Sequence, residues 1–372
     1  MLNIKNILYL GFVLLLTSCS GDAITTGNSL DGNGYDPVGT PILFSVGLQD
    51  KAITRTPTSS PMAKWSHFVC TMYYHSNKND NNYSAFDLTD GKITKAWLEV
   101  SDDAGNATYK NEAFSAAGTP FYWQNRLNHA FVAIANNHAL TSTTSQIIYQ
   151  STSDAGHNTY DLTKGDKTAI TQQPDPIRAV EIQDPSDGTP ANNSVTLNFQ
   201  HQFSLIQVNL KNATSNSTNI TAEQITKVEL LGVSKEGYVY TKLNTDGTIT
   251  ATTGNTINLD TYTDEQLAVN KWGTSFEMFV MDSPADGNLK SFNAIVFGHL
   301  RAIRITWSTH TATFEITEAA QRDLTSGKQY VYNLEISNTT PAAARGQVVD
   351  RALSEQVRLA DVTITNWPLN IE

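Results

Sequence analysis

Cysteine is scarce in this chain, and its scarcity excludes one way of stabilising an exported protein. Only Cys19 and Cys70 occur among the 372 residues. Cys19 is expected to be modified at a processing site described below, which leaves Cys70 without an intramolecular partner and excludes a disulfide framework. Cys70 follows Phe68 and Val69 in a predicted strand, so we expect a buried, inert thiol rather than a nucleophile. Stability must therefore come from packing.

Charge is also sparse, and the charges that occur include no basic cluster. Charged residues make up 16% of the chain, with 36 acidic against 25 basic side chains. Phosphate binding needs clustered Lys and Arg, so nucleic acid is not an expected partner. Thr, Ser and Asn are abundant instead, which favours strands with hydroxyl groups on their outer faces over helices rich in charged residues. Beyond the N-terminus, no apolar run approaches the roughly 20 residues that a membrane-spanning helix needs.

Sequence motifs for catalysis are missing. The chain contains no GxSxG nucleophile turn, no GxxxxGK[ST] phosphate loop and no GxGxxG dinucleotide fingerprint. Its histidines show no HExxH or HxH spacing, and its Asp and Asn clusters do not match a calcium loop, so neither a metal nor a cofactor is expected. A glycan-active enzyme stays a minor alternative, because a carboxylate pair roughly 5 to 10 Å apart would form in space rather than in sequence.

The N-terminus carries the clearest targeting signal. Lys5 precedes an apolar run over residues 7–16, and Leu16-Thr17-Ser18-Cys19 follows. A positive start, a short apolar core and small residues before a cleavage point are typical of a secretory signal, and a Cys directly after that point resembles a bacterial lipobox. We expect residues 1–18 to be a lipoprotein signal peptide and Cys19 to carry the lipid. Residues 19–40, rich in Gly, Asn, Asp and Ser, are expected to form a flexible tether.

From residue 41 onward, short apolar segments alternate with turn residues. The first half has such segments at residues 42–46, 67–74, 96–100, 121–123 and 130–135, a spacing typical of a sandwich of short strands. Prolines at positions 174, 176, 185 and 190 suit a domain boundary better than a sheet interior. We therefore predict an all-β fold of two β-sandwich domains, the first over residues 41–180 and the second over residues 190–372.

The second half begins with the strongest strand pattern in the chain. Apolar and polar residues alternate through Val195-Thr196-Leu197-Asn198-Phe199, which is the period of a half-buried strand. The segment Thr245-Asp246-Gly247-Thr248 predicts a hairpin, because Asp-Gly supplies the positive φ values of such a turn. Residues 348–357 fit either a short helix or an extended arm. Further strands are predicted at residues 227–233, 238–243, 276–281, 294–297, 302–307, 311–316, 329–336 and 362–367.

A lone basic residue stands in a small polar segment after the first predicted strand. Arg55 lies within Thr54-Arg55-Thr56-Pro57, and Ser and Pro residues follow up to position 61. Exposed segments of this composition are where proteases cut. An ordinary surface arginine is the alternative.

Several phrases, in this order and spacing, resemble the fimbrillin family of Bacteroidales type V pili and together cover nearly the whole chain. The resemblance implies two β-sandwich domains of transthyretin-like topology, export as an outer membrane lipoprotein to the cell surface, and polymerisation into fimbriae. The phrases are the lipobox, Thr54-Arg55 after a short first strand, residues 121–123 (FYW), 175–180 (DPIRAV), 195–204 (VTLNFQHQFS), 327–334 (GKQYVYNL) and 364–367 (ITNW).

The resemblance also implies an assembly mechanism, that of the family's stalk subunits. An Arg-specific protease cuts after the first strand, and the groove left behind takes up the C-terminal strand of another subunit. Carried onto this sequence, the scheme makes Cys19 the lipidated residue, Arg55 the cleavage position, residues 42–46 the strand removed, and the segment up to Trp367 the candidate donor.

We therefore expect a non-enzymatic fimbrial subunit or adhesin that assembles by donor-strand exchange and attaches to a host or bacterial surface ligand. Its expected partners are other fimbrial subunits, an Arg-specific protease and, through the lipid, the membrane. The alternative is a surface carbohydrate-binding lipoprotein that does not polymerise, with Trp65, Trp97, Trp123 or Trp272 stacking on sugars. A stalk, tip or anchor position is left open.

Overall fold

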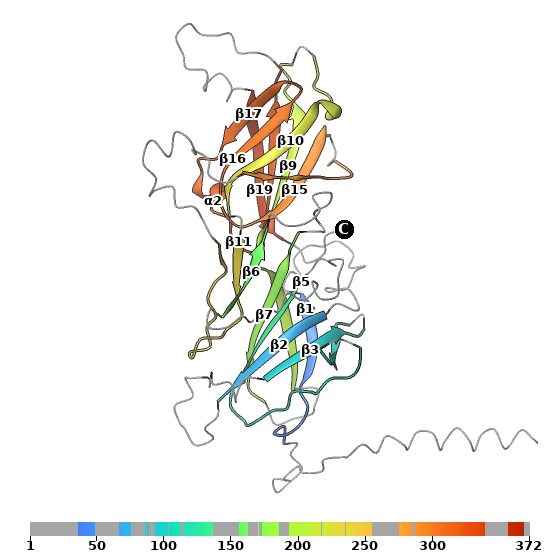
Figure 1. The fold of residues 1–372 in the computed structure, drawn as a ribbon, viewed down its shortest axis with the longest axis vertical. Coiled ribbons are helices and arrows are strands. Elements are labelled where there is room, and N and C mark those ends of the chain that lie inside the picture. Colours follow the sequence, from blue (N-terminus) through green and yellow to red (C-terminus); the bar gives the residue numbers. More distant parts are fainter. Residues whose placement is uncertain are drawn as a thin grey trace, which may run out of the picture.

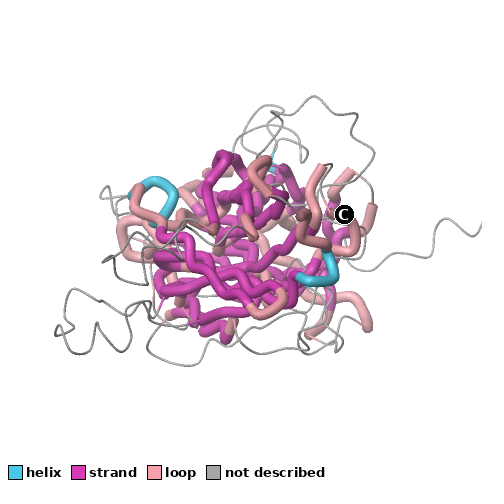
Figure 2. The backbone as a smooth tube through the Cα atoms, turned by 90° about the horizontal axis from the view of Figure 1, so that it is seen from above, coloured by secondary structure: helices cyan, strands magenta, loops and turns pink. Residues whose placement is uncertain are grey.

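In the part of the chain that the computed structural model describes, nearly all of the regular secondary structure is β-strand (Figure 1 and Figure 2). Within the part described, the helical segments are the single turns η6 (Ala222–Gln224) and α2 (Ala319–Arg322), and no helix there is long and apolar enough to cross a membrane. The predicted all-β fold is confirmed. The structure describes residues 36–48, 67–75, 86, 88, 94–102, 104–112, 115–136, 156–162, 170, 173–185, 193–216, 218–234, 236–254, 275–284, 287–338 and 356–367.

Seven strands between residues 43 and 201 close into a barrel. Neighbouring strands are antiparallel except β1 and β8, which run parallel and complete the ring. The first strand therefore closes the barrel between its two neighbours, β4 and β8. In barrel order the strands are β1 (Leu43–Leu48), β4 (Asn106–Lys110), β3 (Thr94–Val100), β2 (His67–Tyr74), β5 (His129–Asn136), β7 (Pro176–Gln183) and β8 (Ser194–His201).

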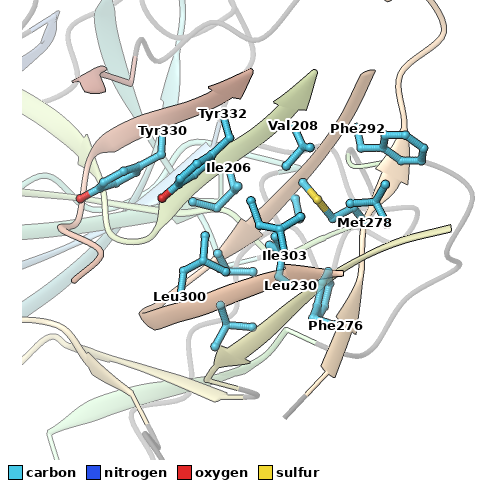
Figure 3. Packing of buried hydrophobic residues seen from close by; sticks show 14 of the residues in the cluster. Ile206, Val208, Leu230, Phe276, Met278, Phe292, Leu300, Ile303, Tyr330 and Tyr332 are labelled. Carbon is cyan, nitrogen blue, oxygen red and sulfur yellow. The ribbon is translucent and has the colours of Figure 1, made fainter. Parts of the chain in front are cut away.

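Two sheets share one core in the second half. Side chains from both sheets form a single hydrophobic cluster, and Figure 3 shows Ile206, Tyr330 and Tyr332 of one sheet near Leu230 and Ile303 of the other. Burying one face of each sheet in this way is the arrangement of a two-layer β structure. The five-stranded sheet has the order β14 (Phe279–Val280), β15 (Lys290–Val296), β9 (Ser204–Asn212), β18 (Lys328–Ile336), β19 (Val357–Asn366), and the four-stranded sheet the order β13 (Ser275–Glu277), β10 (Ile225–Val233), β16 (Gly298–Trp307), β17 (His310–Glu315).

The alternation in the sequence is what places these strands against their cores. In β8, Val195, Leu197 and Phe199 are buried, whereas Thr196 and Gln200 are exposed. Burying each such apolar side chain contributes about 1.5–3 kcal/mol. A shift of one residue would turn the whole apolar set to solvent, so the alternation also sets the register.

A small third sheet and two side chains tie the halves of the chain together. Strand β6 (His157–Asp161), from the first half, pairs with β11 (Glu236–Tyr240), which also pairs with β12 (Thr253–Gly254). In Figure 1, β6 and β11 lie between the barrel and the two-sheet body. Arg178 of β7 donates to the Tyr240 carbonyl oxygen at 2.7 Å. The Gln173 amide exchanges two hydrogen bonds with the Ile295 backbone, at 2.9 and 2.7 Å.

Two local predictions have opposite outcomes. The hairpin at residues 245–248 is confirmed, because Leu243 pairs with Ile249 and Gly247 has a φ of +83°. The strand predicted at residues 121–123 is wrong. That segment forms a single bridge, between Pro41 and Tyr122, to the chain just before β1. Hydrogen bonds flank the bridge on both sides, from the Ile42 amide to the Phe121 carbonyl and from the Trp123 amide to the Thr40 carbonyl, but the pairing is too short to count as a strand.

The strand pairing places β8 in the barrel, although the predicted second domain, residues 190–372, includes it. The next strand, β9, begins at Ser204 and belongs to the five-stranded sheet. Pro176 is the first residue of β7, a position where a strand tolerates proline. The predicted domain limits, 41–180 and 190–372, and the transthyretin-like topology stay predictions.

Candidate functional site

The first strand turns one face to the barrel interior and the other to solvent. Ile42, directly before β1, and Phe44 and Val46 within it are 0%, 2% and 4% exposed, whereas Leu43 is 51% exposed. The three buried residues belong to the hydrophobic core of the barrel. Three consecutive alternate side chains therefore hold β1 in a groove between β4 and β8.

Phe44 is the centre of this buried face. Its ring lies edge-on to Tyr109 of β4, Phe121 and Phe131 of β5, with ring centroids 6.0, 6.1 and 5.4 Å away. Such T-shaped pairs contribute about 0.5–1.5 kcal/mol each beyond the burial of apolar area. The pocket that receives Phe44 is thus a box of aromatic rings, and we call it the aromatic box.

Backbone hydrogen bonds hold β1 along both edges. Six residue pairs, from Leu43 with Ser194 to Leu48 with Phe199, join it to β8. On its other edge the Val46 amide donates to the Gly105 carbonyl at 2.8 Å, and Tyr109 Oη donates to the Ile42 carbonyl at 2.8 Å. Without β1, backbone donors and acceptors on β4 and β8 would lie unpaired beside an open core, which is a costly state that favours uptake of another strand.

A buried histidine lies beside the aromatic box. His129 is fully buried against Trp123 and Phe131. Its Nδ1 donates to the Leu127 carbonyl at 2.8 Å, and its Nε2 accepts from the Gln124 amide at 3.1 Å. Both ring nitrogens are satisfied only when the imidazole is neutral. Burial, the largest cause, lowers the pKa of His129 to about 4.

This depressed pKa predicts acid sensitivity of the barrel. In the unfolded chain the His129 pKa returns to about 6.5, so between about pH 6.5 and pH 4 the unfolded state binds more protons. Neutral His129 therefore costs the barrel no stability above about pH 6.5, and the free energy of unfolding falls by up to about 3 kcal/mol as the pH is lowered toward 4. Urea denaturation of wild type and His129→Gln across this range checks it. The His129→Gln variant should show a flatter pH dependence, and a slope as steep as that of wild type would contradict the assignment. His310→Gln, at a half-buried position outside the barrel, is the control.

The last strand buries fewer of its side chains than the first. Strand β19 forms an edge of the five-stranded sheet by pairing with β18. Of the side chains directed to the core, Val357 is buried, Leu359 and Val362 are partly buried, and Ile364 is 40% exposed. An exposed edge strand with few buried side chains is suited to leaving its sheet or to pairing with another chain.

Trp367 fastens the far end of this strand. Its ring, 3% exposed, stacks on His201 with ring centroids 3.7 Å apart and planes 5° from parallel. His201 Nδ1 in turn donates to the buried Asp175 carboxylate at 2.8 Å, and the Trp367 amide donates to the Gly327 carbonyl at 2.8 Å. We call the Trp367, His201 and Asp175 side chains the tryptophan latch, since they connect the end of β19 to the end of β8.

Only some of the site residues predicted from the sequence lie in the part of the chain that the structure describes. Cys19 and Arg55 lie outside the described residues, and so do Trp65 and Trp272. Trp123 is buried in the barrel core, so the prediction that its ring stacks on sugars at the surface is wrong. Cys70 is a free, buried thiol whose pKa is raised by burial, as expected for an inert cysteine. Among the described residues, no group of three or more His, Cys, Asp or Glu side chains could hold a metal ion.

Sequence reasoning missed the two features that join distant segments. The aromatic box combines residues 44, 109, 121 and 131, and the tryptophan latch combines residues 175, 201 and 367. No local spacing relates these positions. Their only signal in the sequence was the presence of large aromatic residues, of which Phe44, Phe131 and Trp367 lay in predicted strands and Tyr109 did not.

Solved structures with the same fold come from Bacteroides species. A candidate cell adhesion protein of Bacteroides uniformis superposes with a TM-score of 0.51 at 14% identity, covering 88% of this chain and 98% of that one. One of Bacteroides ovatus gives 0.50 at 15% identity, covering 90% and 99%. The C-terminally truncated tip fimbrial protein Mfa3 of Porphyromonas gingivalis gives 0.44 at 10% identity, covering 88% and 100%. These likenesses concern the fold.

Sequence comparison assigns the family. No curated protein matches the chain in sequence. The model of the fimbrillin-like family, in contrast, matches residues 72–367, which is most of the chain. The chain therefore belongs to the fimbrillin-like family, a family of fimbrial proteins rather than enzymes.

Proposed function

We propose that the chain is a lipid-exported fimbrial subunit or adhesin whose first strand is a removable plug. Cys19 carries the lipid that delivers it to the outer membrane, and an Arg-specific protease cuts after Arg55. The observation that supports this best is the construction of β1. It closes the barrel with three buried alternate side chains. Residues 49–66, which contain Arg55, connect it to β2, the next strand along the chain.

Cleavage changes the energetics of the barrel. Once cut, β1 is held only by non-covalent contacts, so a strand from another subunit can replace it. Main-chain hydrogen bonds to β4 and β8 supply affinity, and the alternate pockets that now hold Ile42, Phe44 and Val46 set the register. The C-terminal strand of this chain serves as the donor to a neighbouring subunit, which fits its place at a sheet edge and its few buried side chains.

Replacing Arg55 with Ala should prevent maturation. Wild-type protein recovered from fimbriae of the native cell is expected to begin at Thr56, because a cut after Arg55 removes β1 and the lipid together. The Arg55→Ala chain should keep the N-terminus at Cys19 and be absent from fimbriae. Mass spectrometry of the intact chain measures both, and Lys64→Ala, a basic residue of the same segment, is the matched control.

Two results would count against this function. Trimming of Arg55→Ala at the same position would show that this arginine does not direct the cut. A trimmed wild-type chain that is never found with a strand of another subunit in its barrel would contradict strand exchange itself.

A further inference from the structure

The groove that β1 fills is shaped for an aromatic side chain between two aliphatic ones. Ile42, Phe44 and Val46 occupy it in that order, and all three are buried. The rings of Tyr109, Phe121 and Phe131 lie around the central position, at 5.4 to 6.1 Å between ring centroids. Protein interiors are close-packed and relax only partly around a smaller side chain. An aliphatic residue at the centre would therefore leave a void in the aromatic box.

The C-terminal segment of this chain does not carry that pattern. Within β19 every apolar residue is aliphatic, and the longest alternating apolar set is Ala360, Val362 and Ile364. The nearest aromatic residue is Trp367, which has Thr365 two positions before it and Leu369 two positions after it. Pro368 follows directly and has no N–H to donate to a ladder. Neither of the two sets of alternate residues in 357–372 therefore places an aromatic side chain between two aliphatic ones.

We propose that the groove vacated by β1 selects the strand of a different protein, with an aliphatic-x-aromatic-x-aliphatic pattern, and rejects residues 357–372 of a second copy of this chain. The inference rests on the strand exchange proposed above and adds the chemistry of the partner strand. It places this chain at a joint between unlike subunits rather than within a run of identical ones. The selecting element is the aromatic box, because the backbone ladders on β4 and β8 accept any extended strand.

A displacement assay on the full chain tests the selection. An Arg-specific protease cuts the segment after β1, and synthetic peptides then compete with the seated first strand, with native mass spectrometry measuring replacement. The peptides are residues 40–49, the same peptide with Phe44→Val, residues 356–367 and residues 361–372. The native peptide should displace the strand at a half-maximal concentration at least tenfold lower than the other three. A Leu43→Val peptide is the matched control and should equal the native one, because Leu43 faces solvent.

The outcomes separate this inference from the function on which it rests. Equal displacement by the Phe44→Val peptide or by either C-terminal peptide would overturn the selectivity and leave strand exchange intact. If no peptide enters the groove, including residues 40–49, strand exchange and the selectivity both fail.

If the cut chain unfolds, a second measurement on the uncut chain still tests the selectivity. In the uncut chain, hydrogen exchange over β1 should be at least tenfold faster in Phe44→Val than in Leu43→Val. Equal exchange in the two variants would overturn the role of the aromatic box.

Discussion

Replacing Phe44 with Ala is expected to lower the free energy of unfolding of the barrel by about 3–5 kcal/mol. The substitution removes a buried ring and leaves a cavity bounded by Tyr109, Phe121 and Phe131. These neighbours belong to β4, to the segment before β5, and to β5 itself, so the cavity cannot close by moving one element. Urea denaturation followed by tryptophan fluorescence measures the change.

The control for this experiment lies next to Phe44 on the same strand. Leu43 is 51% exposed, so Leu43→Ala should change the free energy of unfolding by no more than about 0.5 kcal/mol. If Phe44→Ala costs no more than Leu43→Ala, the first strand is not held by its inward face, and the removable-plug function loses its physical basis.

Replacing Trp367 with Ala is expected to free the end of the last strand. The variant loses the stack on buried His201, and replacing a buried tryptophan with alanine costs about 3–5 kcal/mol of stability. Because β19 has only partly buried side chains beyond Leu359, the cost should fall on local opening of the strand rather than on unfolding of the whole chain. A loss of about 3 kcal/mol corresponds to about 100-fold faster hydrogen exchange over the second half of β19.

The pattern of exchange decides between a latch and a general stabilising role. Thr365→Ala, at an exposed position on the same strand, should leave exchange unchanged. An increase spread evenly over β9, β18 and β19 in Trp367→Ala would mean that Trp367 supports the whole sheet. No increase anywhere would mean that the tryptophan latch does not hold the strand. Only an increase confined to β19 agrees with a strand that can be donated.

Strand content was predictable because alternation is a local property. Val195, Leu197 and Phe199 identified β8 from a five-residue window. Asp246-Gly247 identified the hairpin, in which Gly247 but not Asp246 has a positive φ. The segment at residues 121–123 showed the limit of this reasoning. Its aromatic residues are typical of a strand, yet Phe121 and Trp123 serve as core side chains of the barrel beside a single bridge.

The sequence by itself determined that the chain is all-β, that its first strand has one apolar face, and that its motifs resemble those of fimbrillins, because each of these depends on residues close together in the chain. Only the tertiary structure decided that β8 closes the barrel against β1, that three aromatic residues surround Phe44, and that Trp367 stacks on His201. These features join segments separated by tens to hundreds of positions. Local periodicity sets which face of a strand is buried, but only the assembled fold sets which side chains that face meets.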